Sequence, residues 1–495
     1  MLPSGRGRES PPGAAAHPCT PPAGAAPSPR EPWARRFSHC LVARHAPRHP
    51  VLDPARHADR GPAAATVGGV APAAPPDATR LKQLQAVGVL SGFAAGAWLG
   101  AAEAPTKVVT LGLSPVAISL VMVLGVFLAR WSLPALLRGT ANVGADVRRT
   151  PHLVVWALLA GALWAVANTL TIFAIREIGL SIAFPLWNTN SLLGIFWGAL
   201  LFNELRGAGA ARWLGVLGGA GVMFVGAALL ALAAPTQAPA GNPLRGVAAA
   251  LGAGVLWGTM YIPYRKAYLT GMNPLSFVTF FTIGELGMMS GLALAYLDGP
   301  AGVMTELARA RGVVFWLLLG GFVWVVGDLF QQYAAKYVGI GRGIPLSNTN
   351  QLWGLLWGIL VFGELAGSGQ AVYAQVVGGS IVMALGAGAI AFSTAPAAEH
   401  LRWQDAARRE AARYGVEPEY VVARLSGHDP GGAQGRTVWD WMIVIGATAV
   451  FLGFATLAET PRMAIHYTWA WWLTLAMLGL LGGCGFALWR TTRFG

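Results

Sequence analysis

Charged side chains are scarce in this chain. Asp, Glu, Lys and Arg make up only 12% of its 495 residues, about half the share found in soluble proteins. Hydrophobic residues account for 55%, and 20 residues are tryptophan. A protein of this size in water could not bury so much apolar surface. The composition therefore argues against a water-soluble enzyme and predicts a chain that lies in a bilayer.

Cysteine and histidine are also scarce. The three cysteines, Cys19, Cys40 and Cys484, form neither a disulfide framework nor a metal-binding spacing. His152 is the sole histidine between residues 58 and 399, whereas a membrane enzyme would need His, Asp or Cys clustered near the membrane surface. We therefore expect no enzymatic activity, no metal and no other cofactor.

Basic residues are in excess, with a formal net charge of +13. In the central region they stand mainly between apolar stretches, a pattern that orients membrane proteins and argues against a nucleic-acid partner. Residues 1–82 are rich in Pro, Ala and Arg without hydrophobic periodicity, so we predict a disordered tail. A wrongly assigned start codon is the alternative explanation of this tail.

Apolar runs long enough to cross a bilayer as helices recur from residue 83 onward. The first ten expected spans are 84–103, 113–137, 152–175, 180–204, 211–233, 244–264, 274–297, 313–336, 340–363 and 371–393. A polar linker (394–438), expected in the cytoplasm, precedes two further spans at 439–458 and 467–489.

An internal duplication relates residues 83–235, the first repeat, to residues 240–393, the second repeat. The stretch 179–209 aligns without gaps on 339–369, with 16 of 31 positions identical. Each repeat holds five spans, an odd number, so the second enters the membrane upside down relative to the first. The predicted fold is an all-α integral membrane protein: a ten-helix bundle of two inverted five-helix repeats, plus two extra C-terminal transmembrane helices (439–489).

Loop charges suggest an orientation. With a cytoplasmic N-terminus, nine Lys and Arg residues fall in the inner loops of the first ten spans and five in the outer loops. We expect both termini in the cytoplasm and the chain in the inner or plasma membrane. Inverted repeats are typical of transporters, in which two pseudo-symmetric halves rock around one site.

Two Asn-Thr-Asn tripeptides are predicted near the middle of the bilayer. Asn188 and Asn348 each lie about eight residues into a span, entered from opposite sides, which places both about 12 Å deep. Buried amides and hydroxyls suit a neutral, hydroxyl-rich ligand, although Asn also joins transmembrane helices through hydrogen bonds. The expected substrate-binding residues here are Asn188, Asn190, Ser191, Asn348, Asn350 and Gln351.

Aromatic rings would complete such a site, because the C–H face of a sugar packs on a ring. Trp187 stands beside Asn188, and Trp164 and Trp324 occupy matching positions of the two repeats. Asn168 matches Asp328 in the same way. We add Trp187, Trp164, Trp324 and Asn168 to the expected substrate-binding set. An interfacial belt or a packed core is the alternative for the tryptophans.

Helix breakers precede both tripeptides. Pro185 and Pro345 each free a carbonyl near the Asn sites and predict a kink or an unwound turn.

Acidic residues within spans are candidates for proton coupling. Glu285 falls near the centre of the seventh span and Asp328 two-thirds along the eighth. A buried carboxylate can take up a proton on one side and release it on the other. The alternative is an acid hydrogen-bonded inside the bundle, or an ion pair with Arg130. Glu204 and Glu364 repeat at span ends, where we expect helix-end or gate roles.

These motifs resemble a known family. The repeated stretches FPLWNTNSLLG…LLFNEL and IPLSNTNQLWG…LVFGEL are similar to the glucose/ribose-porter branch of the drug/metabolite transporter superfamily, which has ten helices in two inverted repeats. The resemblance covers residues 83–393 and implies uptake of a monosaccharide with a proton. The long tail and the two added C-terminal spans depart from the ten-helix pattern.

The C-terminal addition leaves several roles open. Residues 397–414 fit an amphipathic helix that either lies on the inner membrane surface or caps the bundle. The last two spans are a candidate surface for homo-oligomerisation, and Trp469, Trp471 and Trp472 fit an interfacial belt.

Three functions follow in order of preference. The first is a sugar/proton symporter working by alternating access, with a small neutral sugar, H⁺ and the lipid bilayer as its partners. The second is an exporter of metabolites or drugs from the same superfamily. The third is a membrane protein with a structural or receptor role.

Overall fold

The computed structural model describes residues 78–102, 104–105, 113–178, 183, 186–233, 242–363, 366–367, 369–393, 397–428, 435–459 and 465–495. Within these ranges the chain is helical and has no strand. Most of the predicted tail, together with Pro185 and Glu364, lies outside the described residues.

The helices of the first repeat are α1 (Ala78–Ala101), α3 (Pro115–Leu137), α4 (Thr140–Arg149), α5 (His152–Ile178), α7 (Asn190–Phe202), α8 (Ala210–Trp213), the π-helical turn η2 (Leu214–Gly218) and α9 (Gly219–Ala233). Those of the second repeat are α10 (Pro243–Leu269), α11 (Pro274–Tyr296), α12 (Gly299–Arg309), α13 (Val314–Val338), α14 (Ile340–Ser347), α15 (Asn350–Leu356), the π-helical turn η3 (Trp357–Val361) and α16 (Gln370–Phe392). The C-terminal part adds α17 (Ala397–Tyr414), α18 (Pro418–Leu425), α19 (Val438–Ala455) and α20 (Tyr467–Thr492).

Ten continuous helical stretches of the described chain are long and apolar enough to cross a membrane. They are α1, α3, α5, the run from α8 to α9, α10, α11, α13, α16, α19 and α20. The chain is thus an all-helical, multi-pass membrane protein, and the predicted fold class is confirmed at this level.

Local sequence explains where several spans begin. Helices α3, α10 and α11 each begin with a proline in the first turn, preceded by Ser114, Asn242 and Asn273 respectively. Each of these three side chains accepts a hydrogen bond from a main-chain N–H of the first turn. Proline lacks the N–H that would stay unpaired at this position, and the polar cap satisfies another.

The other two predicted spans, 180–204 and 340–363, are not continuous helices. In both, the helix is interrupted at the Asn-Thr pair of the tripeptide, and α7 and α15 begin at its last Asn. The Thr189 hydroxyl donates to the main-chain oxygen of Leu186 (2.8 Å), and that of Thr349 to Leu346 (2.9 Å). Side chains that bond to nearby carbonyls compete with the helical ladder, so the same sequence interrupts both spans.

The two repeats pack on one another through matching contacts. Helix α1 packs against α13 and α15, whereas its counterpart α10 packs against α5 and α7. Gly100 of α1 lies against the main-chain oxygen of Asn350, and Gly258 of α10 lies against the main-chain oxygen of Asn190 and the side chain of Leu193. A side chain at either glycine would collide with its neighbours. Such exchange of equivalent partners is expected of a duplicated fold. The direction in which each repeat crosses the membrane stays a prediction.

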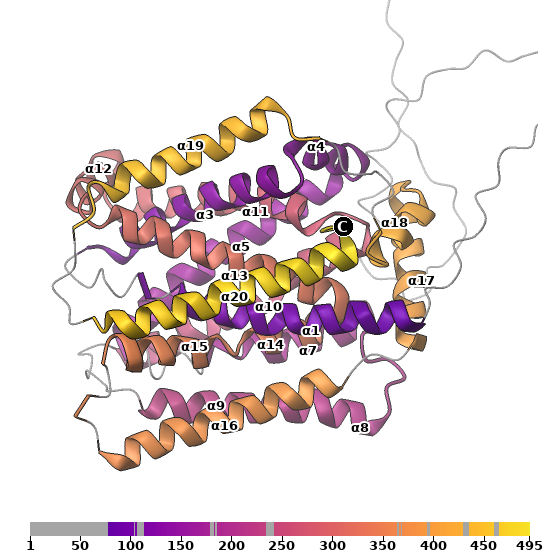
Figure 1. Cartoon of the computed structure of the whole chain (residues 1–495), viewed down its shortest axis with the longest axis horizontal. Helices are drawn as coiled ribbons and strands as arrows, with labels where there is room; N and C mark the ends of the chain where they lie inside the picture. The colour runs from indigo at the N-terminus through magenta and orange to yellow at the C-terminus, as the bar shows by residue number, and fades with distance from the viewer. Residues whose placement is uncertain are drawn as a thin grey trace, which may run out of the picture. The chain divides into compact units, whose positions relative to one another are not determined.

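Four further helices flank this core. Helices α9 and α16 pack against each other and run along the lower edge of Figure 1. Helix α19 packs on α3 and α13, and α20 packs on α1 and η3. The two helices that depart from the ten-helix pattern therefore contact both repeats.

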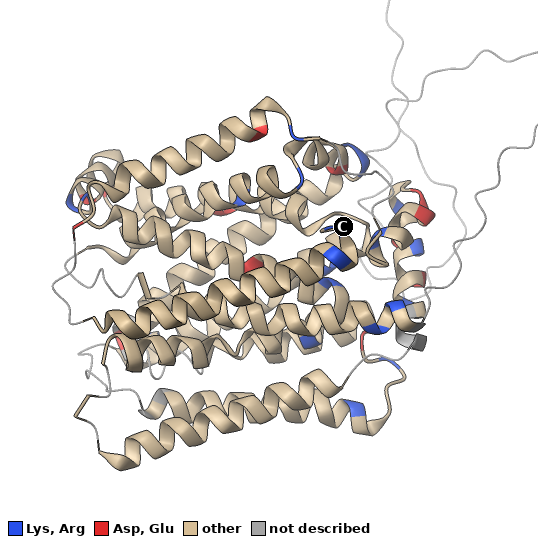
Figure 2. Cartoon of the chain, viewed as in Figure 1, with Lys and Arg blue, Asp and Glu red and all other residues tan. Residues whose placement is uncertain are grey.

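Helices α17 and α18 cover the end of the bundle at which α13 ends (Figure 1). The buried Trp403 of α17 lies over the guanidinium groups of Arg265 and Arg342, at 4.2 and 5.7 Å. Figure 2 shows charged side chains gathered mainly near helix ends, this end included. Of the two alternatives for residues 397–414, the contacts of Trp403 agree with a cap on the bundle.

Asp146 of α4 is a junction at the same end. Its carboxylate pairs with Arg424 of α18 at 2.8 Å. It also accepts a hydrogen bond from the Ser276 hydroxyl (2.6 Å) and one from the main-chain N–H of Asn273 (3.3 Å), both at the start of α11. One buried carboxylate thus joins the first repeat, the second repeat and the C-terminal addition.

Candidate functional site

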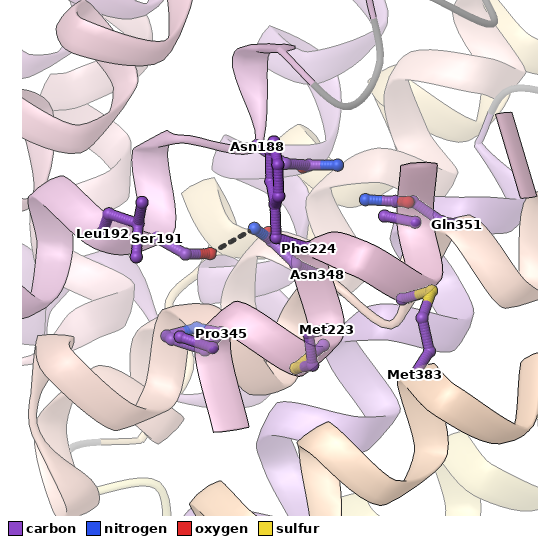
Figure 3. A pocket seen from close by; sticks show the side chains of 11 residues that line it. Asn188, Ser191, Leu192, Met223, Phe224, Pro345, Asn348, Gln351 and Met383 are labelled. Atoms are coloured by element: carbon purple, nitrogen blue, oxygen red, sulfur yellow. Dashed lines mark hydrogen bonds between the residues drawn. The ribbon is translucent and has the colours of Figure 1, made fainter. Parts of the chain in front are cut away.

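The two helix breaks meet and bring polar side chains of both repeats together. The Asn348 amide nitrogen donates to the Asn190 side-chain oxygen at 3.0 Å and to the Ser191 hydroxyl at 2.5 Å. All three side chains are buried. We call Asn188, Asn190, Ser191, Asn348 and Gln351 the amide cluster. Figure 3 shows Asn188, Ser191, Asn348 and Gln351 around one pocket, and Asn190 belongs to the cluster through its bond from Asn348.

The amide cluster borders a small cavity. Asn188, Ser191, Asn348 and Gln351 supply its polar lining, and Met223, Phe224 and Met383 from α9 and α16 supply much of its apolar lining. Its volume is about 20 Å³, room for about one water molecule. The Asn188 amide nitrogen has no hydrogen-bond partner among the described residues. Buried donors are normally hydrogen-bonded, so this N–H group at the cavity wall lacks an acceptor.

The predicted aromatic residues do not line this cavity. Trp164 and Trp324 contact each other across the repeats, with ring centroids 4.9 Å apart in a T-shaped arrangement. Trp187 packs edge-on against Trp257 at 6.1 Å. The three rings are therefore part of the packing between helices in this conformation.

Two of the predicted polar residues also lie apart from the cavity lining. The Asn168 amide donates to the Ser119 hydroxyl at 3.1 Å, within the first repeat. Asn350 is absent from the lining, and its buried side-chain oxygen has no hydrogen-bond partner among the described residues.

A second polar centre lies fully buried among α3, α11 and α13. Arg130 of α3 pairs with Glu285 of α11 at 2.8 Å and with Asp328 of α13 at 2.7 Å, and all three side chains are 0% exposed. Phe281 and Trp324 stack on the guanidinium, 4.1 and 5.1 Å from it. We call Arg130, Glu285 and Asp328 the charged triad. The ion pair weighed as an alternative in the sequence is present and involves both acids.

The charged triad carries one positive and two negative charges when all three groups are ionised. Gln332 donates to Asp328 at 3.1 Å, and the Tyr268 hydroxyl donates to Gln332. Burying an excess charge without a counter-charge is unfavourable. One added proton would make the triad neutral.

Glu204 lies just after the end of α7. Its carboxylate pairs with the Arg265 guanidinium at 2.9 Å. It also accepts hydrogen bonds from the main-chain N–H groups of Ile340 (3.1 Å) and Gly341 (2.9 Å) at the start of α14. An acid at a helix N-terminus satisfies unpaired donors and complements the helix dipole. A loop of the first repeat thus caps the broken helix of the second.

Sequence reasoning missed several residues of these centres. Arg130 entered only as a partner of the acids, although an arginine inside an apolar span signals a buried ion pair. Gln332 stands one helical turn beyond Asp328, on the same helix face, and that spacing could have identified it. Tyr268 comes from another helix, and no local pattern indicates it. Within the described residues, no cluster of His, Cys, Asp and Glu could hold a metal ion.

Comparisons with known proteins give a limited similarity. No protein-family profile matches the chain. It is 24% identical over 217 residues to the Glucose uptake protein GlcU of Staphylococcus xylosus, and the match covers 43% of this chain and 69% of that protein. A solved structure described as "Crystal structure of protein" matches this chain with a TM-score of 0.37 and 16% identity. The match covers 61% of this chain and 97% of the chain in that structure. That structural similarity is too low to support an argument.

Proposed function

We propose that the chain is a secondary active transporter that takes up a monosaccharide with a proton by alternating access. We further propose that it belongs to the glucose/ribose-porter branch of the drug/metabolite transporter superfamily. The amide cluster carries the proposal, because two broken helices, one from each repeat, meet there beside a cavity. Broken helices at a repeat interface are where many transporters bind substrate. The partial similarity to a glucose uptake protein supports a sugar.

The chemistry of the cavity supports a neutral ligand. Its polar lining consists of amides and one hydroxyl, without a charged side chain. Such groups both donate to and accept from sugar hydroxyls. If the asparagines served only to join helices, the bond from Asn348 to Asn190 would suffice. The unpartnered Asn188 amide at the cavity wall favours a binding role instead.

The cavity is too small for a sugar, so the proposed cycle includes movement of the helices around it. A space for about one water molecule does not hold a sugar, so the helices around it have to separate during transport. In the proposed cycle the two repeats rock and open the cavity to one side at a time. Following the loop charges, both termini lie in the cytoplasm.

The charged triad supports proton coupling. It lacks one positive charge for neutrality, and Glu285 and Asp328 are the groups that would hold the added proton. Arg130 of the first repeat pairs with two acids of the second. A proton bound to either acid therefore weakens the electrostatic attraction between the two repeats. Glu204 has the proposed role of a gate at the end of the bundle covered by α17.

Uptake by proteoliposomes that contain the full chain tests this function. We expect one or more labelled monosaccharides from a panel to accumulate when an inward proton gradient is imposed, and only to equilibrate without it. Empty liposomes are the control. Failure to transport any sugar, with efflux of another class of compound, would favour an exporter instead.

A further inference from the structure

One turn of α13 contacts the charged triad and also the residue that precedes Asn348 of the amide cluster. Asp328 faces Arg130 of the charged triad, and Gln332, one turn later, bonds to Asp328. Gln331, between them in sequence, points elsewhere: its amide nitrogen donates to the Ser347 hydroxyl at 2.6 Å. Gln331, Gln332 and Ser347 are all buried. The turn therefore joins the triad on one side to α14 on the other.

Ser347 lies where the broken helix ends. It is the last residue of α14, and Asn348 of the amide cluster follows it. The Ser347 hydroxyl donates to the main-chain oxygen of Ile344 at 2.8 Å, so its oxygen is left to accept from Gln331. A shift of this α13 turn that kept the Gln331 bond would move the end of α14, and with it the amide that reaches Asn190 and Ser191.

The connection lies in the interior of the bundle. Gln331 and Ser347 are 5% and 0% exposed. Hydrogen bonds in such a low-dielectric interior are strong and directional. A rigid helical turn with a fixed bond at each side is the kind of contiguous element that carries coupling between sites.

In the part of the first repeat that the structure describes, no equivalent connection is present. Asn168 and Thr171 occupy the positions that match Asp328 and Gln331. Asn168 bonds to Ser119, and the Thr171 hydroxyl donates to the main-chain oxygen of Asn168 in its own helix (2.7 Å). Among the described residues, the link between charge and amide cluster is thus built into the second repeat.

We propose that Gln331 and Ser347 are the positioning residues that couple protonation of the charged triad to the substrate site; this rests on the proposed function. Protonation of the triad alters the attraction between Arg130 and Asp328 and shifts the α13 turn. Gln331 passes that shift to Ser347, and the end of α14 repositions Asn348. Neither residue lines the cavity, so their loss disconnects the two events and leaves sugar binding in place.

Transport by proteoliposomes containing Gln331→Leu or Ser347→Ala separates coupling from binding. We expect counterflow exchange of labelled sugar without a gradient to stay within about twofold of the native rate. Accumulation driven by a pH gradient should fall at least about fivefold, the lower range of allosteric coupling. The number of protons per sugar, followed with an internal pH dye, should fall with it. The double variant should lose no more than either single one.

Two variants serve as controls. Ser347→Thr keeps the hydroxyl and should keep accumulation. Ser380→Ala removes a hydroxyl of α16 that bonds only to its own helix at Val376 (2.8 Å), and it should behave as native. Undiminished accumulation in Gln331→Leu, or a parallel loss of exchange and accumulation, would overturn the inference alone. A native chain that exchanges no sugar would overturn the proposed function and this inference with it.

Discussion

Arg130 on α3 and Asp328 on α13 form a 2.7 Å ion pair that joins the first repeat to the second in the fully buried part of the bundle. Glu285 contacts the same guanidinium at 2.8 Å, so the charged triad carries one more negative than positive charge when all three groups are ionised. Burying an uncompensated charge is costly, and ionisable residues inside membrane spans commonly mark a functional site.

Asp328→Asn removes one negative charge and leaves the triad neutral without a proton. We expect the variant to fold and to exchange sugar in counterflow, while accumulation driven by a pH gradient is abolished. The exposed acid Asp405 of α17 provides the matched control, Asp405→Asn, which should accumulate sugar as the native chain does. Concentrative uptake at the native level by Asp328→Asn would contradict proton coupling at this residue.

Arg130→Met leaves two buried carboxylates without their counter-charge. Removing one partner of a buried ion pair destabilises a protein by about 3–5 kcal/mol, so we expect a clearly lower midpoint of thermal unfolding in detergent. Combining Arg130→Met with Glu285→Gln and Asp328→Asn removes all three charges and should restore most of the lost stability, seen as a higher unfolding midpoint. If the single variant is as stable as the native chain, the triad is not the buried charge centre described above.

Asn348→Ala removes the amide that joins the two broken helices and lines the cavity. Loss of a buried polar contact of about 1–3 kcal/mol should raise the KM for the transported sugar about tenfold. Gln375→Leu is the control, since this amide of α16 bonds to the main-chain oxygen of Leu229 and lies outside the cavity lining. An unchanged KM in Asn348→Ala would remove it from the substrate site.

Glu204→Ala leaves the start of α14 without its cap and takes away the ion-pair partner of Arg265. We expect a loss of about 3–5 kcal/mol of stability, measured as a lower unfolding midpoint in detergent. Glu410→Ala is the comparison, because the Glu410 to Lys266 pair at the same end is partly exposed and worth less than about 1 kcal/mol. Equal effects of the two substitutions would argue against a special role for Glu204.

Much of the fold follows from the sequence because apolar length is a local property. The spans expected at 113–137 and 274–297 correspond closely to α3 and α11. The interruptions at Asn188 and Asn348 show where length alone misleads, since side-chain bonds to main-chain oxygens end the helix there. Pro345 stands before one of these breaks.

Partners across helices are harder to predict, because spacing does not say which helix faces which. The repeat matches Asn168 with Asp328, yet Asn168 bonds to Ser119 within its own repeat. Trp164 and Trp324, which the sequence predicts for the substrate site, contact each other across the repeats, and their spacing along the chain does not indicate this contact. Gln331 and Ser347 lie 16 positions apart on different helices, and only the packing of α13 on α14 reveals their contact.

Asp146 has a consequence for how the repeats can move. Its carboxylate receives bonds from Arg424 of the C-terminal addition and from Ser276 at the start of the second repeat, while its own helix belongs to the first. Trp403 of α17 also packs over Arg265 and Arg342, which connects the C-terminal addition to the second repeat. The bonds of Asp146 join the two repeats at one end of the bundle. Opening the cavity toward the end covered by α17 and α18 would have to break them, whereas opening toward the opposite end would leave them in place.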